Sequence, residues 1–470
     1  MLFSSLTFLF GFLTLLLLVY FVCKKRNLKN IVLLLFSLIF YAWGEPKYII
    51  LMLITIAIVY LFGLLINKFD LEKKKALKKC SLILCVILVL SSLIFFKYFD
   101  FIIYNINFLF KTNVKSLNLV LPIGISFYTF QILSYIIDLY KGKIKVQKNV
   151  LNLALYVSFF PQLIAGPIVR YETIEDEIMN RKESFSLVVT GLKRFIIGLS
   201  KKVIIANNMA LVADFILDKA LVDYGTSIVW IGAFAYTFQI YFDFSGYSDM
   251  AIGLGQIFGF HFLENFNYPY IALSITDFWR RWHISLSTWF RDYVYIPLGG
   301  NRKGVLKQIR NILIVWGLTG LWHGASWNFV IWGLYYALFL LIEKFLLRRF
   351  IDKVPKFIRW LFTIIIVVIG WIIFRTTSFS GIYLLIGRMF IYTKTDWVSI
   401  ISSNVSLLNS FIYFIPAIIF SFPILGKIRK KYANKNLYVM FSNLAYLVLL
   451  FINVMFLTSS SYNPFIYFRF

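Results

Sequence analysis

Charged residues and cysteines are both scarce in this chain. Asp, Glu, Lys and Arg make up 15% of its 470 residues, against about 25% in typical soluble domains. Only three cysteines are present, and none forms the closely spaced pair that indicates a disulfide framework or a zinc site. We therefore predict neither a disulfide-stabilised secreted domain nor a metal-binding protein.

Hydrophobic residues dominate instead. They make up 60% of the chain, and 51 residues are phenylalanine. A soluble protein buries only about three quarters of its surface, so this composition indicates that lipid surrounds most of the molecule. The net charge of +27 does not indicate a nucleic-acid partner, because the basic residues collect in short loops between apolar runs, as in the cytoplasmic loops of membrane proteins. We expect membrane lipid, and no nucleic acid, as a partner.

The apolar runs predict an all-α, polytopic transmembrane bundle. The first run, 2–22, lacks the basic start of a cleaved signal peptide, so we expect a retained helix. Lysines and an arginine follow it at 24–29, and the positive-inside bias then places the N-terminus outside. The same bias places the C-terminus outside. The other clear runs are 31–43, 48–66, 82–96, 119–140, 360–374, 411–425 and 444–457.

The middle of the chain differs from its ends. We expect one integral membrane domain over 1–470, with scaffold helices at 1–149, a catalytic middle at 150–343 and further helices at 344–470. The middle is interrupted by prolines, glycines and charged residues. Irregular backbone is tolerated at membrane depth only where protein or a water-filled cavity covers it. We therefore predict re-entrant or interfacial helices around a central cavity.

A strongly polar segment lies within this middle. Over 276–292, one polar residue recurs every three or four positions, which places these residues on one face of a helix. They are Thr276, Arg280, His283, Ser287 and Arg291. We predict one continuous helix that lies either on the membrane surface or along the wall of a polar cavity.

A second histidine lies in a run that is too long for one membrane helix. Residues 311–342 contain no Asp, Glu, Lys or Arg, and a straight helix of that length would span about 48 Å, against a hydrocarbon core of about 30 Å. We predict two helices, with the break at Gly317, Gly320 and Gly324. His323 lies at that break.

An ionisable residue at membrane depth indicates function, although a neutral histidine bonded to a carbonyl is the structural alternative. An imidazole, with an ordinary pKa of about 6.5, can take a proton from a hydroxyl that attacks an acyl donor. A covalent acyl intermediate on Ser326 is a second possibility. A metal site is not indicated, because the two histidines lack further ligands at suitable spacing.

Two motifs carry a resemblance to a known family. The segment Asp277-Phe-Trp-Arg-Arg-Trp-His-Ile-Ser-Leu-Ser-Thr-Trp-Phe-Arg-Asp-Tyr-Val-Tyr-Ile-Pro-Leu-Gly-Gly-Asn301, with Gly320-Leu-Trp-His-Gly-Ala-Ser-Trp-Asn328, resembles the membrane-bound O-acyltransferases, and within them the alginate O-acetyltransferase branch. The stretches 121–131, 160–167, 241–249 and 463–467 are similar to the same branch.

The resemblance implies a helix bundle with a funnel or tunnel through a bacterial plasma membrane. It implies acetyl transfer from a cytosolic donor, acetyl-CoA, towards the outer face. There an esterase-like partner of the SGNH type would complete O-acetylation of a polysaccharide such as alginate or peptidoglycan. His323 matches the family's catalytic histidine and His283 its second motif histidine.

We assign catalysis to His323 and His283. The predicted substrate contacts are Arg280, Arg281, Trp282, Ser287, Trp322, Ser326 and Asn328, and the predicted contacts to donor phosphates are Lys201, Lys202, Arg302 and Lys303. Three alternatives remain open at this point. They are D-alanyl transfer to teichoic acid, a proton-coupled transporter or flippase, and a scaffold that only anchors a partner enzyme.

Overall fold

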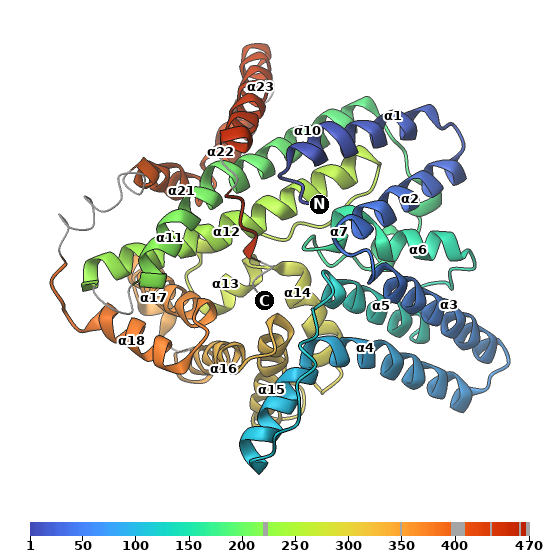
Figure 1. Ribbon diagram of the computed structural model, residues 1–470, viewed down its shortest axis with the longest axis horizontal. Helices are drawn as coiled ribbons and strands as arrows, with labels where there is room; N and C mark the ends of the chain where they lie inside the picture. Colours follow the sequence, from blue (N-terminus) through green and yellow to red (C-terminus); the bar gives the residue numbers. More distant parts are fainter. Residues whose placement is uncertain (220–223, 348–349, 396–408, 433–434, 460–461, 467–470) are drawn as a thin grey trace. The chain divides into compact units, whose positions relative to one another are not determined.

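The computed structural model describes residues 1–219, 224–347, 350–395, 409–432, 435–459 and 462–466 (Figure 1). Within these ranges every regular element is a helix and no strand is present, as the composition predicts. The last residue of the C-terminal motif, Tyr467, lies outside the described residues. The chain divides into two compact units. Unit 1 comprises residues 1–195 and 250–263, and unit 2 comprises residues 196–249 and 264–470.

Unit 1 consists mainly of the N-terminal helices. They are η1 (Thr7–Leu13), α1 (Thr14–Val22), α2 (Arg26–Gly44), α3 (Ile49–Leu71), α4 (Lys75–Phe110), α5 (Ile125–Tyr140), α6 (Val150–Ser158), α7 (Phe160–Leu163), α8 (Tyr171–Ile174) and α9 (Glu177–Asn180). Helices α3 and α4 form an antiparallel pair (Figure 1). Helices α10 (Phe185–Ser200) and α12 (Thr226–Ile257) each belong in part to both units.

Unit 2 contains the remaining helices. They are η2 (Lys201–Ala206), α11 (Asn207–Lys219), η3 (Pro269–Ile271), α13 (Ile275–Arg281), α14 (Ile284–Phe290), η4 (Arg291–Tyr295), α15 (Val305–His323), α16 (Trp327–Leu341), η5 (Ile342–Leu347), η6 (Ile351–Lys353), α17 (Lys356–Arg375), α18 (Phe379–Phe390), η7 (Phe411–Tyr413), α21 (Phe414–Phe420), α22 (Ile424–Tyr432) and α23 (Asn436–Ser459).

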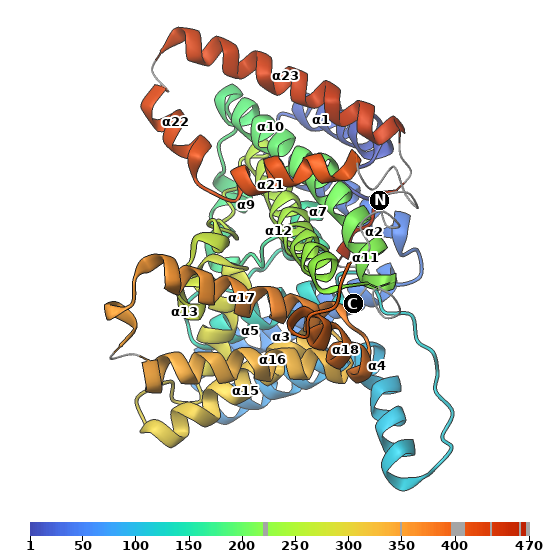
Figure 2. The same cartoon turned by 90° about the vertical axis from the view of Figure 1, so that its left-hand side faces the viewer.

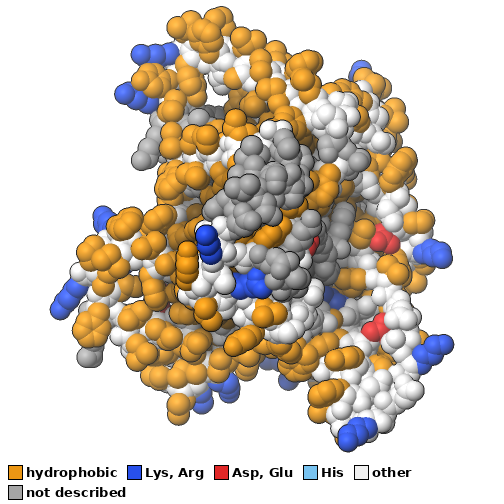
Figure 3. All heavy atoms as spheres, turned by 60° about the vertical axis from the view of Figure 1, so that its left-hand side comes forward, with side chains coloured by type: hydrophobic (Ala, Val, Ile, Leu, Met, Phe, Trp, Pro, Cys, Tyr) orange, Lys and Arg blue, Asp and Glu red, His pale blue; other side chains and the backbone are white. Residues whose placement is uncertain are grey.

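Seven helical stretches of the described chain are long and apolar enough to cross a membrane. They are Arg26–Gly44, Ile49–Leu71, Lys75–Phe110, Phe185–Asp218, Trp327–Leu347, Lys356–Arg375 and Asn436–Ser459. Hydrophobic side chains cover most of the face shown in Figure 3, and Lys and Arg occur there only at scattered points. The protein is therefore a multi-pass membrane protein, as predicted.

Helix α5 forms the centre of unit 1, because 14 of its 16 residues are buried. It begins at Ile125 rather than at residue 119, where the apolar run begins. The preceding turn places Gly124 at a φ of 77°, a conformation that favours glycine. A Cβ on Gly124 would also lie 2.7 Å from the carbonyl oxygen of Leu163. The Pro122–Gly124 turn therefore shortens the predicted helix.

Helices α15 and α16 of unit 2 pack side by side (Figure 2). Two glycines permit this contact. A Cβ on Gly320 would lie 2.2 Å from the carbonyl oxygen of Phe329, and a Cβ on Gly333 would lie 2.2 Å from that of Trp316. The long apolar run is thus two helices, and His323 is the last residue of the first. The division into two helices and the position of His323 at the break confirm the prediction, but Gly317 and Gly320 lie inside α15, so only Gly324 of the three predicted glycines lies at the break.

The C-terminal strap, residues 462–466, is anchored in unit 2 by polar contacts. The hydroxyl of Tyr462 donates a hydrogen bond to Asp214 at 2.5 Å, and the amide of Ile466 donates one to Asp243 at 2.8 Å. Asp243 also forms a buried ion pair with Lys202 at 2.7 Å, and the Lys202 ammonium donates a hydrogen bond to the carbonyl of Pro464. The strap is therefore fixed to helices η2, α11 and α12.

Candidate functional site

The polar segment 276–292 is not the single helix that its periodicity predicts. Helix α13 ends at Arg281, α14 begins at Ile284, and His283 lies between them at a φ of 45°. A left-handed residue interrupts the helical path, so residues before and after His283 do not continue along one helix face. The prediction of a common stripe of polar side chains is therefore wrong, although His283 itself lies at the centre of the segment.

The preceding loop stabilises this break. The Asn265 carboxamide oxygen accepts hydrogen bonds from the Ser285 amide at 3.1 Å and the Ser285 hydroxyl at 2.9 Å. The Asn265 carbonyl accepts one from the Ile284 amide, and the Arg281 carbonyl accepts one from the Asn267 amide. Asn265 thus caps α14, as asparagine commonly does. Sequence reasoning missed this residue, because it lies 20 positions before Ser285.

The imidazole of His283 is buried, with 3% of the residue exposed. Its ring lies 5.9 Å from the ring of Trp322 and 6.3 Å from that of Phe266, between ring centroids. The Ser285 hydroxyl lies 3.5 Å from Nδ1. Burial lowers the pKa of His283 to about 3, because desolvation disfavours the charged form. The ring is therefore neutral at physiological pH.

Aromatic rings surround His323, of which 8% is exposed. Its ring centroid lies 4.8 Å from Trp322, 5.0 Å from Trp332 and 5.1 Å from Phe374, and all three contacts are edge-on. Trp322 contacts His323 and His283 alike. The structure thus brings the two predicted catalytic histidines and the predicted contact Trp322 into one cluster.

Among the buried polar atoms near this cluster that have no hydrogen-bond partner within the described part of the chain are two on α16. They are Oδ1 of Asn328 and Nε1 of Trp332. Buried polar groups are almost always paired, so these atoms are suited to bind a substrate group or water. Asn328 was predicted as a substrate contact. Ser326, half-buried, lies just before α16.

A pocket of about 200 Å³ opens beside the same aromatic cluster. Its lining residues come from α13, α14, η4 and α15, and they are Trp279, Leu286, Ser287, Phe290, Arg291, Tyr295, Ile312, Val315, Trp316 and Thr319. The Trp279 ring also contacts Trp332, with 5.6 Å between centroids. The Trp279 ring therefore lines the pocket and also contacts Trp332, the tryptophan next to His323. Ser287 is the predicted substrate contact that lines the pocket.

The remaining predicted substrate contacts lie apart from the pocket lining. Arg280 is exposed, and Arg281 pairs with Asp277 at 2.9 Å. Trp282 is buried against other aromatic residues, among them Trp371, with 4.7 Å between ring centroids. Its position indicates packing within the hydrophobic core of unit 2.

The four predicted phosphate contacts have two different environments. The ammonium of Lys201 pairs with Asp249 at 2.6 Å, and Lys202 is buried in its pair with Asp243. Arg302 and Lys303 are exposed in the turn between η4 and α15. Of the four residues, only Arg302 and Lys303 present exposed cationic groups. The described residues contain no group of three or more His, Cys, Asp or Glu that could hold a metal ion.

Comparison with known proteins places this site in a family. Residues 144–386 match the model of the membrane-bound O-acyltransferase family. This range contains both His283 and His323. The chain belongs to the membrane-bound O-acyltransferase family. It is therefore an O-acyltransferase, which favours an enzyme over the transporter and scaffold hypotheses.

Individual members of the family are similar over most of the chain. A probable alginate O-acetylase AlgI of Azotobacter vinelandii is 44% identical over 404 residues, which cover 84% of this chain and 79% of the relative. A peptidoglycan O-acetyltransferase of Helicobacter pylori is 39% identical over 81% of this chain and 78% of the relative. A teichoic acid D-alanyltransferase of Bacillus subtilis is 33% identical over 58% of this chain and 70% of the relative.

Proposed function

We propose that this O-acyltransferase transfers acetyl groups for the O-acetylation of a cell-surface or extracellular polysaccharide, with His323 as general base. The observation that carries this proposal is the cluster of His323, Trp322 and His283, in which one indole contacts both imidazoles. The similarity to an alginate O-acetylase and a peptidoglycan O-acetyltransferase supports acetyl as the group transferred.

The chemical step follows from the properties of a neutral imidazole. A ring nitrogen of His323 takes the proton of an acceptor hydroxyl as the oxygen attacks the thioester carbonyl. A carbon–oxygen bond forms, and the carbon–sulfur bond then breaks. The leaving sulfur takes the proton back from the imidazolium, which regenerates the neutral ring. The aromatic rings around His323 exclude water, and this favours transfer to the acceptor over hydrolysis of the thioester.

The donor in this proposal is acetyl-CoA, and the pocket beside Trp279 receives its thioester arm. Trp316 and Leu286 supply apolar walls, while Ser287 and Arg291 supply polar groups. Of the four predicted phosphate contacts we propose Arg302 and Lys303, because the ammonium groups of Lys201 and Lys202 are paired with carboxylates. The turn that carries Arg302 and Lys303 directly joins two helices of the pocket wall.

The acceptor side of the proposal follows from topology. We propose that the chain lies in the bacterial plasma membrane with both termini outside, which the alternation of basic loops supports. This topology requires an even number of crossings, so in this proposal the shorter apolar helix Thr7–Val22 also crosses the membrane. A cytosolic donor and an external polymer are separated by the membrane. An extracytoplasmic, esterase-like partner of the SGNH type would then pass the acetyl group to the polymer. The hydroxyl from which His323 removes the proton would then belong to that partner or to a carrier.

Purified protein in vesicles with radiolabelled acetyl-CoA tests the proposal. We expect label to move from the thioester to a hydroxyl acceptor in a membrane extract, and free CoA to appear in equal amount. A parallel assay with D-alanyl thioester tests the alternative of teichoic acid D-alanylation, which the more distant Bacillus subtilis relative suggests. Transfer from the D-alanyl donor alone would overturn the acetyl proposal.

A further inference from the structure

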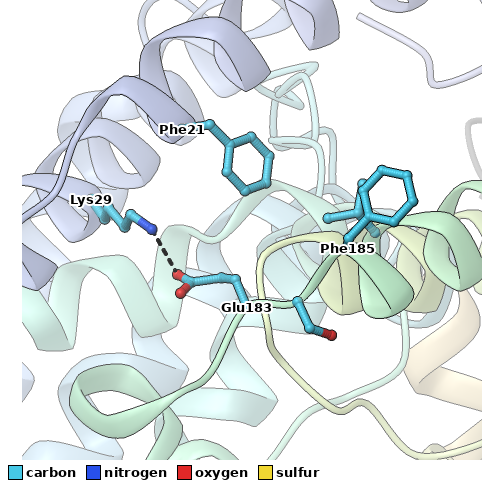
Figure 4. A pocket seen from close by; sticks show the side chains of 6 residues that line it. Phe21, Lys29, Glu183 and Phe185 are labelled. Atoms are coloured by element: carbon cyan, nitrogen blue, oxygen red, sulfur yellow. Dashed lines mark ion pairs between the residues drawn. The ribbon is translucent and has the colours of Figure 1, made fainter.

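A second pocket, in unit 1, lies where three helix ends meet. It measures about 500 Å³ and is lined by Phe21, Lys29, Glu183, Ser184, Phe185 and Val188 (Figure 4). Helix α1 ends at Val22, α2 begins at Arg26 and α10 begins at Phe185. Helix α2 and the stretch that begins with α10 are long and apolar enough to span a membrane. The ends of such helices lie at the level of the lipid headgroups.

Cations outnumber anions around the Glu183 carboxylate, which lines this pocket together with one of them, Lys29. The carboxylate of Glu183 is paired with Arg26, with Lys29 at 3.4 Å and with Arg181 at 3.9 Å. Burial alone would raise the pKa of Glu183, but hydrogen bonds from Arg26 and Tyr20 lower it to about 2. The carboxylate is therefore charged at neutral pH. Three cations around one anion leave a local charge of +2.

This excess charge is held in partly buried groups. The side chain of Arg181 is fully buried, that of Lys29 is 14% exposed and that of Arg26 is 23% exposed. Like charges in a setting of low dielectric repel strongly, so a further anion stabilises the arrangement. Lys29 also lies 4.9 Å from the centre of the Tyr20 ring, and its ammonium points to the Glu183 carboxylate at the pocket (Figure 4).

Apart from the exposed Ser184, the rest of the pocket lining is apolar, and its two aromatic side chains are exposed. Phe185 is 84% exposed and Phe21 is 45% exposed. Both rings line the pocket together with the Glu183 carboxylate (Figure 4). Large exposed apolar side chains are unfavourable in water but favourable against lipid acyl chains. A phosphate beside the cations would place an attached acyl chain against these rings.

We propose that the pocket binds an anionic phospholipid, with its phosphate near Lys29 and an acyl chain against Phe21 and Phe185. Free phosphate carries the same negative charge but has no acyl chain to pack against Phe21 and Phe185. A phospholipid is therefore the ligand that contacts both the cationic and the aromatic residues of the pocket. This inference concerns unit 1 alone and does not depend on the acyl transfer proposed above.

Binding is measured by native mass spectrometry of the full-length protein, delipidated in neutral detergent and titrated with phosphatidylglycerol or phosphatidylcholine. We expect tighter retention of the anionic lipid. Lys29→Met should weaken its binding roughly 5-fold, because one cation near a phosphate contributes about 1 kcal/mol. Lys78→Met is the matched control. Lys78 also lies near an aromatic ring, that of Tyr140, and pairs with Asp70 at 2.6 Å.

Two further variants keep the test decisive if Lys29→Met folds poorly. Phe185→Ser changes an exposed side chain and should weaken lipid binding without affecting the binding of inorganic phosphate. Glu183→Gln raises the local charge and should strengthen lipid binding. Equal retention of the two lipids, or equal effects of Lys29→Met and Lys78→Met, would overturn the proposal. Phosphate binding with no response of lipid binding to Phe185→Ser would identify a free-anion site and also overturn it.

Discussion

The indole of Trp332 meets the imidazole of His323 edge-on, with 5.0 Å between ring centroids and 84° between ring planes. The indole Nε1 is buried and has no hydrogen-bond partner within the described part of the chain. A tryptophan in this position serves two purposes in our account. Its ring limits water around His323, and its N–H is available to a substrate oxygen.

Trp332→Phe separates these two purposes, because phenylalanine keeps an aromatic ring and removes the N–H. A net hydrogen bond contributes about 0.5–1.5 kcal/mol, so we expect kcat for acetyl transfer to fall roughly 3- to 10-fold. Trp43→Phe, at a side chain that is 63% exposed in unit 1, is the control and should keep the wild-type rate. An unchanged kcat in Trp332→Phe would show that the N–H takes no part in transfer.

The contact of α15 with α16 predicts opposite outcomes for two glycines of one helix. Gly320→Ala would place a Cβ 2.2 Å from a carbonyl oxygen, whereas Gly317→Ala meets nothing within 4 Å. Overpacking typically costs about 1–3 kcal/mol, while alanine in a helix gains up to about 1 kcal/mol over glycine. We expect a lower thermal midpoint in detergent for Gly320→Ala and an equal or higher one for Gly317→Ala. Equal losses in both variants would contradict this packing.

The burial of His283 predicts a pH dependence of stability. Its folded pKa is lowered to about 3, below the unfolded value of about 6.5. Between these values the unfolded state binds the extra proton, so the free energy of unfolding decreases as the pH falls, by up to about 1.4 kcal/mol per pH unit. The contribution of the neutral, buried His283 to the free energy of unfolding is therefore fully present above about pH 6.5.

His283→Asn removes this titration, and asparagine tolerates the positive φ at that position. Thermal unfolding of both proteins between pH 8 and pH 4 measures the difference. We expect the wild type to lose stability relative to the variant only below about pH 6.5. A difference that stays constant over the whole range would show that His283 is not buried in a neutral form.

The ion pair between Lys202 and Asp243 anchors the C-terminal strap, and both side chains are almost fully buried. Lys202→Met leaves the Asp243 charge unpaired, and breaking a buried pair costs about 3–5 kcal/mol. We expect a large loss of folded protein in gel filtration, and recovery when Asp243→Asn is added. Lys201→Met, in a partly exposed pair, should cost at most about 1 kcal/mol. If the double variant did not recover folded protein, the loss in Lys202→Met would not come from the unpaired Asp243 charge.

The sequence alone predicts six of the seven long apolar helical stretches, because long apolar runs have few alternative structures, but it misses Phe185–Asp218, and the predicted run 411–425 is broken between α21 and α22. It also places His323 correctly at the end of α15, since the length of the run requires a break and Gly324 follows His323 directly. The resemblance in its motifs, confirmed by the family comparison, indicates the chemistry. These features depend on residues close together in the chain.

The break at His283 was not predicted, because periodicity continues through it. It depends on the hydrogen bonds that Asn265 accepts from the first amides of α14 and on the one that the Asn267 amide donates to the Arg281 carbonyl at the end of α13, and both residues are distant in sequence from these contacts. For the same reason the ion pairs of Lys201 and Lys202 and the contact of Trp322 with both histidines appear only in the structure. Tertiary contacts decide which polar residues are available to a substrate.

The central claim is that His323 removes the proton of the acceptor hydroxyl. The most direct measurement compares His323→Ala with His261→Ala, whose exposed side chain pairs with Glu177 in unit 1. Acetyl transfer from labelled acetyl-CoA is measured with equal amounts of each protein in vesicles. We predict that His323→Ala reduces the rate about 10²- to 10⁴-fold and that His261→Ala retains it. Transfer at the wild-type rate by His323→Ala would contradict the account.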